Sequence, residues 1–200
     1  MKTIEGIAAP LPLANVDTDV IMPKRFLITI TREGLADGTL ADLRFDNAGQ
    51  LRPEFILNKA PWTWATILIV GDNFGCGSSR EHAVWGLRQL KIVACIGTSF
   101  AGIFYDNARK NGLALPIVSP KTRDALLRFS SNARGAKVSI NLDNRTITAG
   151  ETSVVFEMDN ATRTSLIRGS DDTLDTLEQA AAIHDFEATL DDSMWVNVIQ

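Results

Sequence analysis

The sequence is poor in cysteine and has no excess of positive charge, and each shortage excludes a class of protein. Its two cysteines, Cys76 and Cys95, lie far apart without CxxC spacing, so we expect neither a disulfide framework nor a metal site. A formal net charge of −4 does not provide the basic footprint of a nucleic-acid-binding protein. No apolar run approaches the ~20 residues that cross a bilayer, and no export signal is recognisable, so we expect a cytoplasmic protein.

The chain does contain enough apolar sequence for one domain with a substantial core. Of its 200 residues, 45% are hydrophobic. Short apolar runs predict buried strands at 4–9, 67–70 and 92–96, and a further strand, bent by Pro116, at 113–118. Intervening helices are predicted over 79–90 and 99–111, and another helix over 121–132. Strands that alternate with helices through short loops predict a parallel core sheet.

The second half of the chain predicts an additional antiparallel layer. Residues 138–142 and 145–148 alternate with period two around a two-residue turn, Asp143-Asn144, which is typical of a hairpin. Residues 152–156 are expected to add a third antiparallel strand. The fold class predicted for the chain is therefore α/β, with a parallel core and an antiparallel layer.

Two segments lie outside this pattern. Residues 29–62 lack periodicity and contain several glycines and prolines, so we expect a long functional loop with little helix. A C-terminal helix is predicted over 172–190, and its possible packing positions are Leu174, Leu177, Ala181 and Phe186. His184 on this helix is expected to be exposed or to cap it.

The most informative segment is the stretch GDNFGCGSSREH at 71–82. Glycines between a strand and a helix let the backbone approach a ligand closely. The N–H groups of the first helical turn attract an anion, and a serine there would lose its proton more easily than in water. An arginine two residues after the first serine can hold a carboxylate with two hydrogen bonds. The segment therefore predicts a site for a small dicarboxylate.

Other interpretations of the same residues remain open. Ser78 and Glu81 have the spacing of a capping box, which coexists with an anion site. A dinucleotide turn is disfavoured because the third glycine of GxGxxG would fall on Arg80. A serine hydrolase is disfavoured because GxSxG is missing, and His82 is expected to pack locally. Cys76 is either a reactive thiol near a helix N-terminus or a small residue in a tight turn.

Three motifs together resemble one family. They are NVDTDVIMPKRFL at 15–27, GDNFGCGSSREHAVWGL from Gly71, and SFAGIFYDNARKNGLALPI at 99–117. In this order and spacing they are similar to small subunits of 3-isopropylmalate dehydratase, the detached swivel domain of the aconitase superfamily. The resemblance extends over nearly the whole chain, and implies one swivelling β/β/α domain over 1–200 with a C-terminal helical extension at about 160–200.

The resemblance also implies a reaction and a partner. The family isomerises 2-isopropylmalate to 3-isopropylmalate by dehydration and rehydration, in leucine biosynthesis. A separate large subunit would carry the [4Fe–4S] cluster, and this chain, with two scattered cysteines, would bind none by itself. The expected assembly is a heterodimer or larger, inactive without the large subunit.

The resemblance assigns roles to individual residues. Ser78 would be the catalytic base, acting as an alkoxide, while Ser79 and Arg80 would bind a substrate carboxylate. Arg32, in the long loop, is the candidate for a second carboxylate clamp. Three further residues would orient the site: Asp19, Gly75 and Gly77. Asp19 is equally compatible with a turn or helix cap.

The identity of the acid depends on the loop that follows the first motif. The bacterial leucine-pathway form usually has a Gly-Phe-Gly pattern and a tryptophan there, whereas this chain has Leu35-Ala36 and Leu43. The alternatives are therefore the same chemistry on citraconate, methylmalate or homoaconitate, or a swivel module that binds without turnover.

Overall fold

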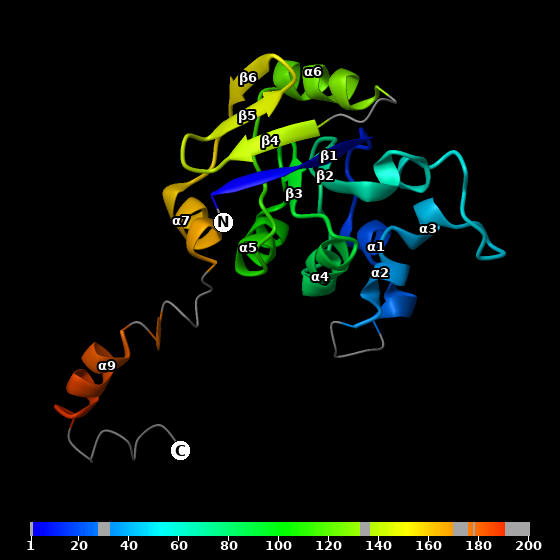
Figure 1. Ribbon diagram of the computed structural model, residues 1–200. Coiled ribbons are helices and arrows are strands. Elements are labelled where there is room, and N and C mark those ends of the chain that lie inside the picture. The colour runs from blue at the N-terminus through cyan, green and yellow to red at the C-terminus, as the bar shows by residue number, and fades with distance from the viewer. Residues whose placement is uncertain (1, 28–32, 133–136, 170–175, 178, 191–200) are drawn as a thin grey trace. The chain divides into compact units, whose positions relative to one another are not determined.

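One mixed sheet organises the main part of the chain (Figure 1). The computed structural model describes residues 2–27, 33–132, 137–169, 176–177 and 179–190. Contacts divide the chain into two units, Met1–Gly169 and Ser170–Gln200. Within the described residues the sheet has six strands, in the order β3-β2-β1-β4-β5-β6.

The pairing of the strands changes from parallel to antiparallel at the N-terminal strand of the chain. The parallel strands are β1 (Thr3–Leu11), β2 (Ala65–Val70) and β3 (Ala94–Ile96). The antiparallel strands are β4 (Lys137–Asn141), β5 (Thr146–Ala149) and β6 (Thr152–Val155). β1 pairs with β2 on one side and with β4 on the other. The predicted α/β class, with a parallel core and an antiparallel layer, is confirmed.

Two predicted details of the sheet are wrong. The segment 113–118 forms isolated bridges beside β3, at Ala94–Ala114 and Gly97–Ile117, and is not a continuous strand. Pro116 has no N–H to donate, so the ladder is interrupted there. The hairpin turn is also longer than two residues, because Asn141 pairs with Thr146 and four residues connect the strands.

Helices cover the two faces of the sheet. α4 (Glu81–Gln89) and α5 (Gly102–Lys110) lie on one face, and α6 (Pro120–Ser130) lies on the other (Figure 1). α7 (Asn160–Arg168) packs beside α5 and ends at Gly169 in the left-handed conformation. α6 begins where Ser119 accepts a hydrogen bond from the Thr122 N–H at 3.2 Å, followed by Pro120 at the first helical position.

The segment between β1 and β2 contains only short helices. They are α1 (Thr18–Ile21), η1 (Lys24–Phe26), α2 (Leu35–Gly38), α3 (Ala41–Arg44), η2 (Ile56–Asn58) and η3 (Trp62–Trp64). Trp62 is buried and donates its indole N–H to the Ser130 carbonyl at 2.9 Å, whereas Trp64 is 78% exposed. Trp62 therefore belongs to the core, and Trp64 does not.

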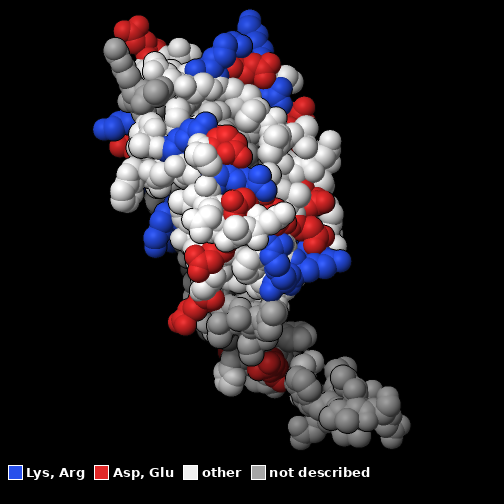
Figure 2. Space-filling model, turned by 90° about the vertical axis from the view of Figure 1, so that its right-hand side faces the viewer, with Lys and Arg blue, Asp and Glu red and all other residues white. Residues whose placement is uncertain are grey.

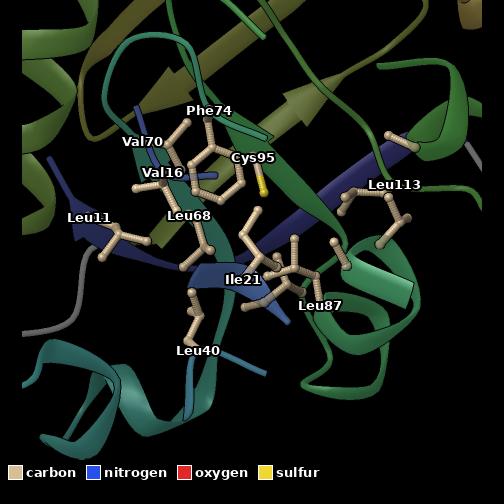
Figure 3. Close-up of a cluster of buried hydrophobic side chains, with 14 of the residues drawn as sticks. Leu11, Val16, Ile21, Leu40, Leu68, Val70, Phe74, Leu87, Cys95 and Leu113 are labelled. Atoms are coloured by element: carbon tan, nitrogen blue, oxygen red, sulfur yellow. The ribbon is translucent and has the colours of Figure 1, made fainter. Parts of the chain in front are cut away.

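The core beneath α4 and α5 also anchors the site. Val16, Ile21 and Phe74 share one buried cluster with the strand residues Leu68 and Val70. Figure 3 shows these side chains converging from the strand, from the segment that follows β1, and from the loop after β2. Both site-bearing segments are therefore held by the same apolar contacts.

In the second unit, residues 172–175 and 178 of the predicted helix lie outside the described residues, and the described helix ends before residue 190. α9 spans Ala180–Glu187, and none of its residues is buried. Of the predicted packing positions, Leu177, Ala181 and Phe186 are exposed, while Leu174 lies outside the described residues. His184 is exposed on α9, as expected. Among the described residues, no helix has the length and apolar character needed to span a membrane.

Charges of both signs are mixed on the surface that Figure 2 shows, which is the right-hand side of Figure 1. Lysine and arginine side chains lie beside aspartate and glutamate across the described part of this face. Ion pairs of this kind include Arg25 with Asp42 and Arg52 with Glu54.

Candidate active site

The candidate site lies on the loop between β2 and α4, residues 71–80, which we call the serine loop. It leaves the sheet at the carboxyl end of β2, where the Gly71 N–H donates to the Leu11 carbonyl at 3.2 Å. Asp72 and Asn73 then contact Asn15, through Asn15 N–H to the Asp72 carbonyl at 2.8 Å and the Asn73 amide to the Asn15 side chain at 2.9 Å. The first motif and the serine loop therefore lie side by side.

A second set of hydrogen bonds continues this contact along the serine loop. Gly75 N–H donates to the Val16 carbonyl at 2.7 Å, and Thr18 N–H donates to the Cys76 carbonyl at 2.8 Å. The Thr18 hydroxyl donates to the Ser78 carbonyl at 2.9 Å. These three hydrogen bonds join the first motif to the serine loop as far as Ser78, which lies 60 residues after Thr18 in the sequence.

The other side of the serine loop rests on the segment before α5. Phe74 N–H donates to the Ser99 carbonyl at 3.3 Å, Ala101 N–H donates to the Phe74 carbonyl at 3.2 Å, and the Asn73 N–H donates to the Ser99 hydroxyl at 2.9 Å. The Phe74 ring meets the Phe104 ring edge to face, with centroids 5.6 Å apart. All three sequence motifs therefore meet at this loop.

Glycine is required at two positions of the loop. Gly75 has φ +79° and Gly77 has φ +91°, a region that side chains with a Cβ rarely adopt. A Cβ at Gly75 would also overlap the Phe104 ring. At Gly77 a Cβ would lie 3.3 Å from that of Asp17. These glycines let the loop turn while it stays against the neighbouring segments.

Ser78 and Ser79 are exposed, and within the described residues the Ser78 hydroxyl has no hydrogen-bond partner. The Arg80 side chain is only 12% exposed and forms an ion pair with Asp19, whose side chain is 44% exposed. The hydrogen bond from Arg80 holds the pKa of the Asp19 carboxyl below its usual value. The structure thus pairs Arg80 with Asp19 of the first motif, and both serines stand exposed just before this arginine in the chain.

The start of α4 differs from the prediction. The helix begins at Glu81, and its N-cap is Arg80, which makes no side-chain capping bond. Ser78 therefore precedes the helix and forms no capping box, because Glu81 instead accepts a hydrogen bond from the Asn111 amide at 2.7 Å. The same Asn111 accepts from the Trp85 indole N–H at 2.9 Å, so this network ties α4 to the end of α5. His82 packs on Trp85, with ring centroids 4.8 Å apart, as expected for local packing.

The hollows that the structure shows elsewhere do not include the serine loop. A groove of about 1160 Å³ lies against α5 and β6, and a smaller one of about 680 Å³ lies against η1 and α3. Neither is lined by Ser78, Ser79 or Arg80. Ser78 and Ser79 are exposed, so this part of the serine loop is open to solvent on this chain. Arg32, the other candidate clamp, lies outside the described residues.

The cysteines do not fit the ligand set of an iron–sulfur cluster. Cys95 is fully buried on β3, and burial raises the pKa of its thiol, which disfavours the thiolate that a metal needs. Cys76 is half-buried in the serine loop and its carbonyl is held by Thr18. No group of three or more potential metal ligands occurs in the part of the chain that the structure describes.

Comparisons with known proteins show the family to which the chain belongs. The model of the aconitase C-terminal domain family matches residues 1–122, which include all three motifs and the serine loop. A 3-isopropylmalate dehydratase small subunit from Jannaschia sp. is 48% identical over 188 residues, 93% of each chain. The chain belongs to the family of 3-isopropylmalate dehydratase small subunits. A small subunit from Paracoccus denitrificans is 45% identical over 197 residues, covering 97% of this chain and 98% of the relative.

Structural comparison leads to the same family. The crystal structure of 3-isopropylmalate dehydratase from Methanocaldococcus jannaschii has 28% sequence identity and a TM-score of 0.65. The match covers 92% of this chain and 99% of that one. The expected swivel-domain fold of the family is confirmed.

Sequence reasoning missed two residues that build the site. Thr18 and Ser99 hold the serine loop from opposite sides, yet neither was a candidate. A signal for Thr18 was present, because it lies between two aspartates in the first motif that carried the resemblance.

Proposed function

We propose that this chain is the small subunit of a hydro-lyase that converts 2-isopropylmalate to 3-isopropylmalate, and that Ser78 is its catalytic base. The observation that carries the proposal is that Ser78 is exposed on a loop held by the first motif, two residues before an arginine that is paired with Asp19. An open surface of this kind suits a site that is completed when a second polypeptide docks on it.

The chemistry requires a base and an anion clamp from this chain. In the first half-reaction the Ser78 alkoxide takes a proton from C3 of 2-isopropylmalate, and the hydroxyl leaves C2 as hydroxide to give isopropylmaleate. In the second half-reaction hydroxide adds to C3 and Ser78 returns the proton to C2, so atoms and charge balance. Ser79 and Arg80 bind a substrate carboxylate throughout, and Arg32 supplies a second clamp.

Removing a proton from a serine hydroxyl needs strong stabilisation of the alkoxide. The nearby Arg80 guanidinium and the amides at the start of α4 are the groups of this chain that can supply it. Asp19 keeps the guanidinium in place. A [4Fe–4S] cluster on the large subunit supplies the Lewis acid that assists departure of hydroxide.

The decisive experiment replaces Ser78 by alanine in the assembled two-subunit enzyme. General-base catalysis contributes about 10²–10⁴-fold, so kcat is expected to fall by at least that factor while assembly is unchanged. Absorbance of the alkene intermediate follows both half-reactions. Ser153→Ala, on the exposed edge strand β6, is the matched control and is expected to keep the parental rate.

Three outcomes would contradict the proposal or one part of it. A Ser78→Ala enzyme as fast as the Ser153→Ala control would remove this serine from the mechanism. A cluster-loaded complex of parental sequence without turnover on any 2-hydroxy dicarboxylate would favour a binding module. Turnover of citraconate or homoaconitate instead of 2-isopropylmalate would leave the proposed reaction type standing and show that the substrate is a different acid.

The proposed location of the protein is the cytoplasm.

A further inference from the structure

Thr18 holds two carbonyls of the serine loop at once. Its N–H donates to the Cys76 carbonyl at 2.8 Å, and its hydroxyl donates to the Ser78 carbonyl at 2.9 Å. The side chain is 2% exposed and lies under Gly77, whose Cβ, if present, would be 3.5 Å from the Thr18 hydroxyl oxygen. A single buried residue therefore binds the loop on both sides of Gly77, which has φ +91°.

These two bonds limit the directions that Ser78 can take. A carbonyl and the next residue's N–H share one planar peptide unit. Holding the Cys76 carbonyl fixes the unit before Gly77, and holding the Ser78 carbonyl fixes the unit after Ser78. The peptide unit between them is constrained from both ends, so the bond from Cα to Cβ of Ser78 has little freedom.

The hydrogen bond from the Thr18 hydroxyl to the Ser78 carbonyl also directs the Ser79 N–H outward. In a trans peptide the carbonyl and the following N–H point in opposite directions. Because the Ser78 carbonyl points at Thr18, the Ser79 N–H points away from it. Within the described part of the chain, this N–H has no acceptor. A donor next to the Ser78 hydroxyl is therefore left for a negatively charged group of the substrate.

We propose that Thr18 is a positioning residue for the reaction: its hydroxyl sets the direction of the Ser78 side chain and of the Ser79 N–H. This inference rests on the proposed function of Ser78. Thr18 touches no substrate in this scheme and acts only through the loop. A threonine hydroxyl is needed because an apolar side chain of the same shape fills the space but leaves the Ser78 carbonyl unpaired.

The test compares three variants in the assembled two-subunit enzyme. Thr18→Val keeps the shape and removes the hydroxyl, and Thr18→Ser keeps the hydroxyl. Ser130→Ala removes a buried hydroxyl that donates to the Leu127 carbonyl at 3.1 Å, on α6 across the sheet from α4. It therefore controls for the general loss of one internal hydrogen bond.

Thr18→Val is expected to lower kcat by about 10–10²-fold, the effect of misplacing a reacting group, with little change in KM. Thr18→Ser restores most of kcat, and Ser130→Ala keeps the parental kcat. In the isolated chain, amide hydrogen exchange at Gly75, whose N–H is protected by its hydrogen bond to the Val16 carbonyl at 2.7 Å, becomes faster in Thr18→Val than in the parent. If the valine variant does not fold, Thr18→Ala takes its place in both measurements.

The inference is overturned if Thr18→Val has the kcat of Ser130→Ala, or if Thr18→Ser remains as slow as the valine variant. An unchanged exchange rate at Gly75 contradicts it independently of activity. Ser78→Ala separates this failure from failure of the proposed function. If Ser78→Ala is inactive while Thr18→Val is normal, only the role of Thr18 is wrong; if Ser78→Ala is active, the proposed base itself is wrong.

Discussion

Replacing Gly75 by alanine is expected to destabilise the chain much more than the same change at Gly49. Both glycines have nearly the same left-handed backbone, with φ +79° and φ +76°. Their surroundings differ, because a Cβ at Gly75 would overlap the buried Phe104 ring, whereas a Cβ at Gly49 has nothing within 4 Å. Gly49→Ala therefore isolates the backbone contribution from the steric one.

The magnitude follows from these two contributions. A residue with a Cβ in the left-handed region loses about 1–2 kcal/mol, and this contribution is common to both variants. Overpacking at Phe104 adds about 1–3 kcal/mol at Gly75 only. The stabilisation that alanine gives by restricting the unfolded chain is the same at both positions and cancels in the comparison. The expected losses in the free energy of unfolding are thus about 2–5 kcal/mol for Gly75→Ala and about 1–2 kcal/mol for Gly49→Ala.

Urea denaturation of the isolated chain measures both values, with tryptophan emission as the signal and an unchanged dependence on urea as the check that the same surface unfolds. In thermal unfolding, each kcal/mol lost from the free energy of unfolding should lower Tm by about 2–4 °C for a chain of this size. Equal losses for the two variants would refute the reasoning, because they would show that the Phe104 ring does not limit the space at Gly75.

Two further pairs of measurements test other parts of the structure. Asp19→Asn should lower Tm at neutral pH, because the Arg80 ion pair lowers the pKa of Asp19 below 3.8. The difference in Tm between variant and parent should persist above pH 3.8 and disappear as the pH falls through the lowered pKa. A difference in Tm that stays constant down to low pH would contradict the ion pair. Trp62→Phe leaves the Ser130 carbonyl without its buried donor and should reduce the free energy of unfolding by about 1–3 kcal/mol. Trp64 is 78% exposed, so Trp64→Phe should change the free energy of unfolding by less than about 0.5 kcal/mol. Equal effects of the two tryptophan changes in urea denaturation would show that the indole hydrogen bond contributes little.

Local patterns predicted much of the fold. The apolar runs at β2 and β3 predicted buried parallel strands, because side chains covered on both faces are apolar throughout. Alternation with period two predicted the β4–β5 hairpin, and glycines after a strand predicted the serine loop. These features depend on residues close together in sequence.

Features that depend on distant partners were not predictable in this way. Periodicity placed the start of α4 near Ser79, but the Arg80 ion pair with Asp19 and the Glu81 contact with Asn111 lie at the true start. The Thr18 hydroxyl meets the Ser78 carbonyl across 60 residues, which no local pattern reveals. Which of two neighbouring tryptophans is buried likewise depends on α6, where the Ser130 carbonyl lies.

The place of β1 inside the sheet affects how the chain is made. Its residues Thr3 to Ile7 pair with β4, which begins at Lys137, so the two partners are more than 125 residues apart. The family match ends at residue 122, before β4, and a fragment of that length would leave one side of β1 with unpaired N–H and C=O groups. During synthesis, this open edge persists until the ribosome has released the β4 hairpin. A shortened version that retained only the matched part would therefore tend to self-associate.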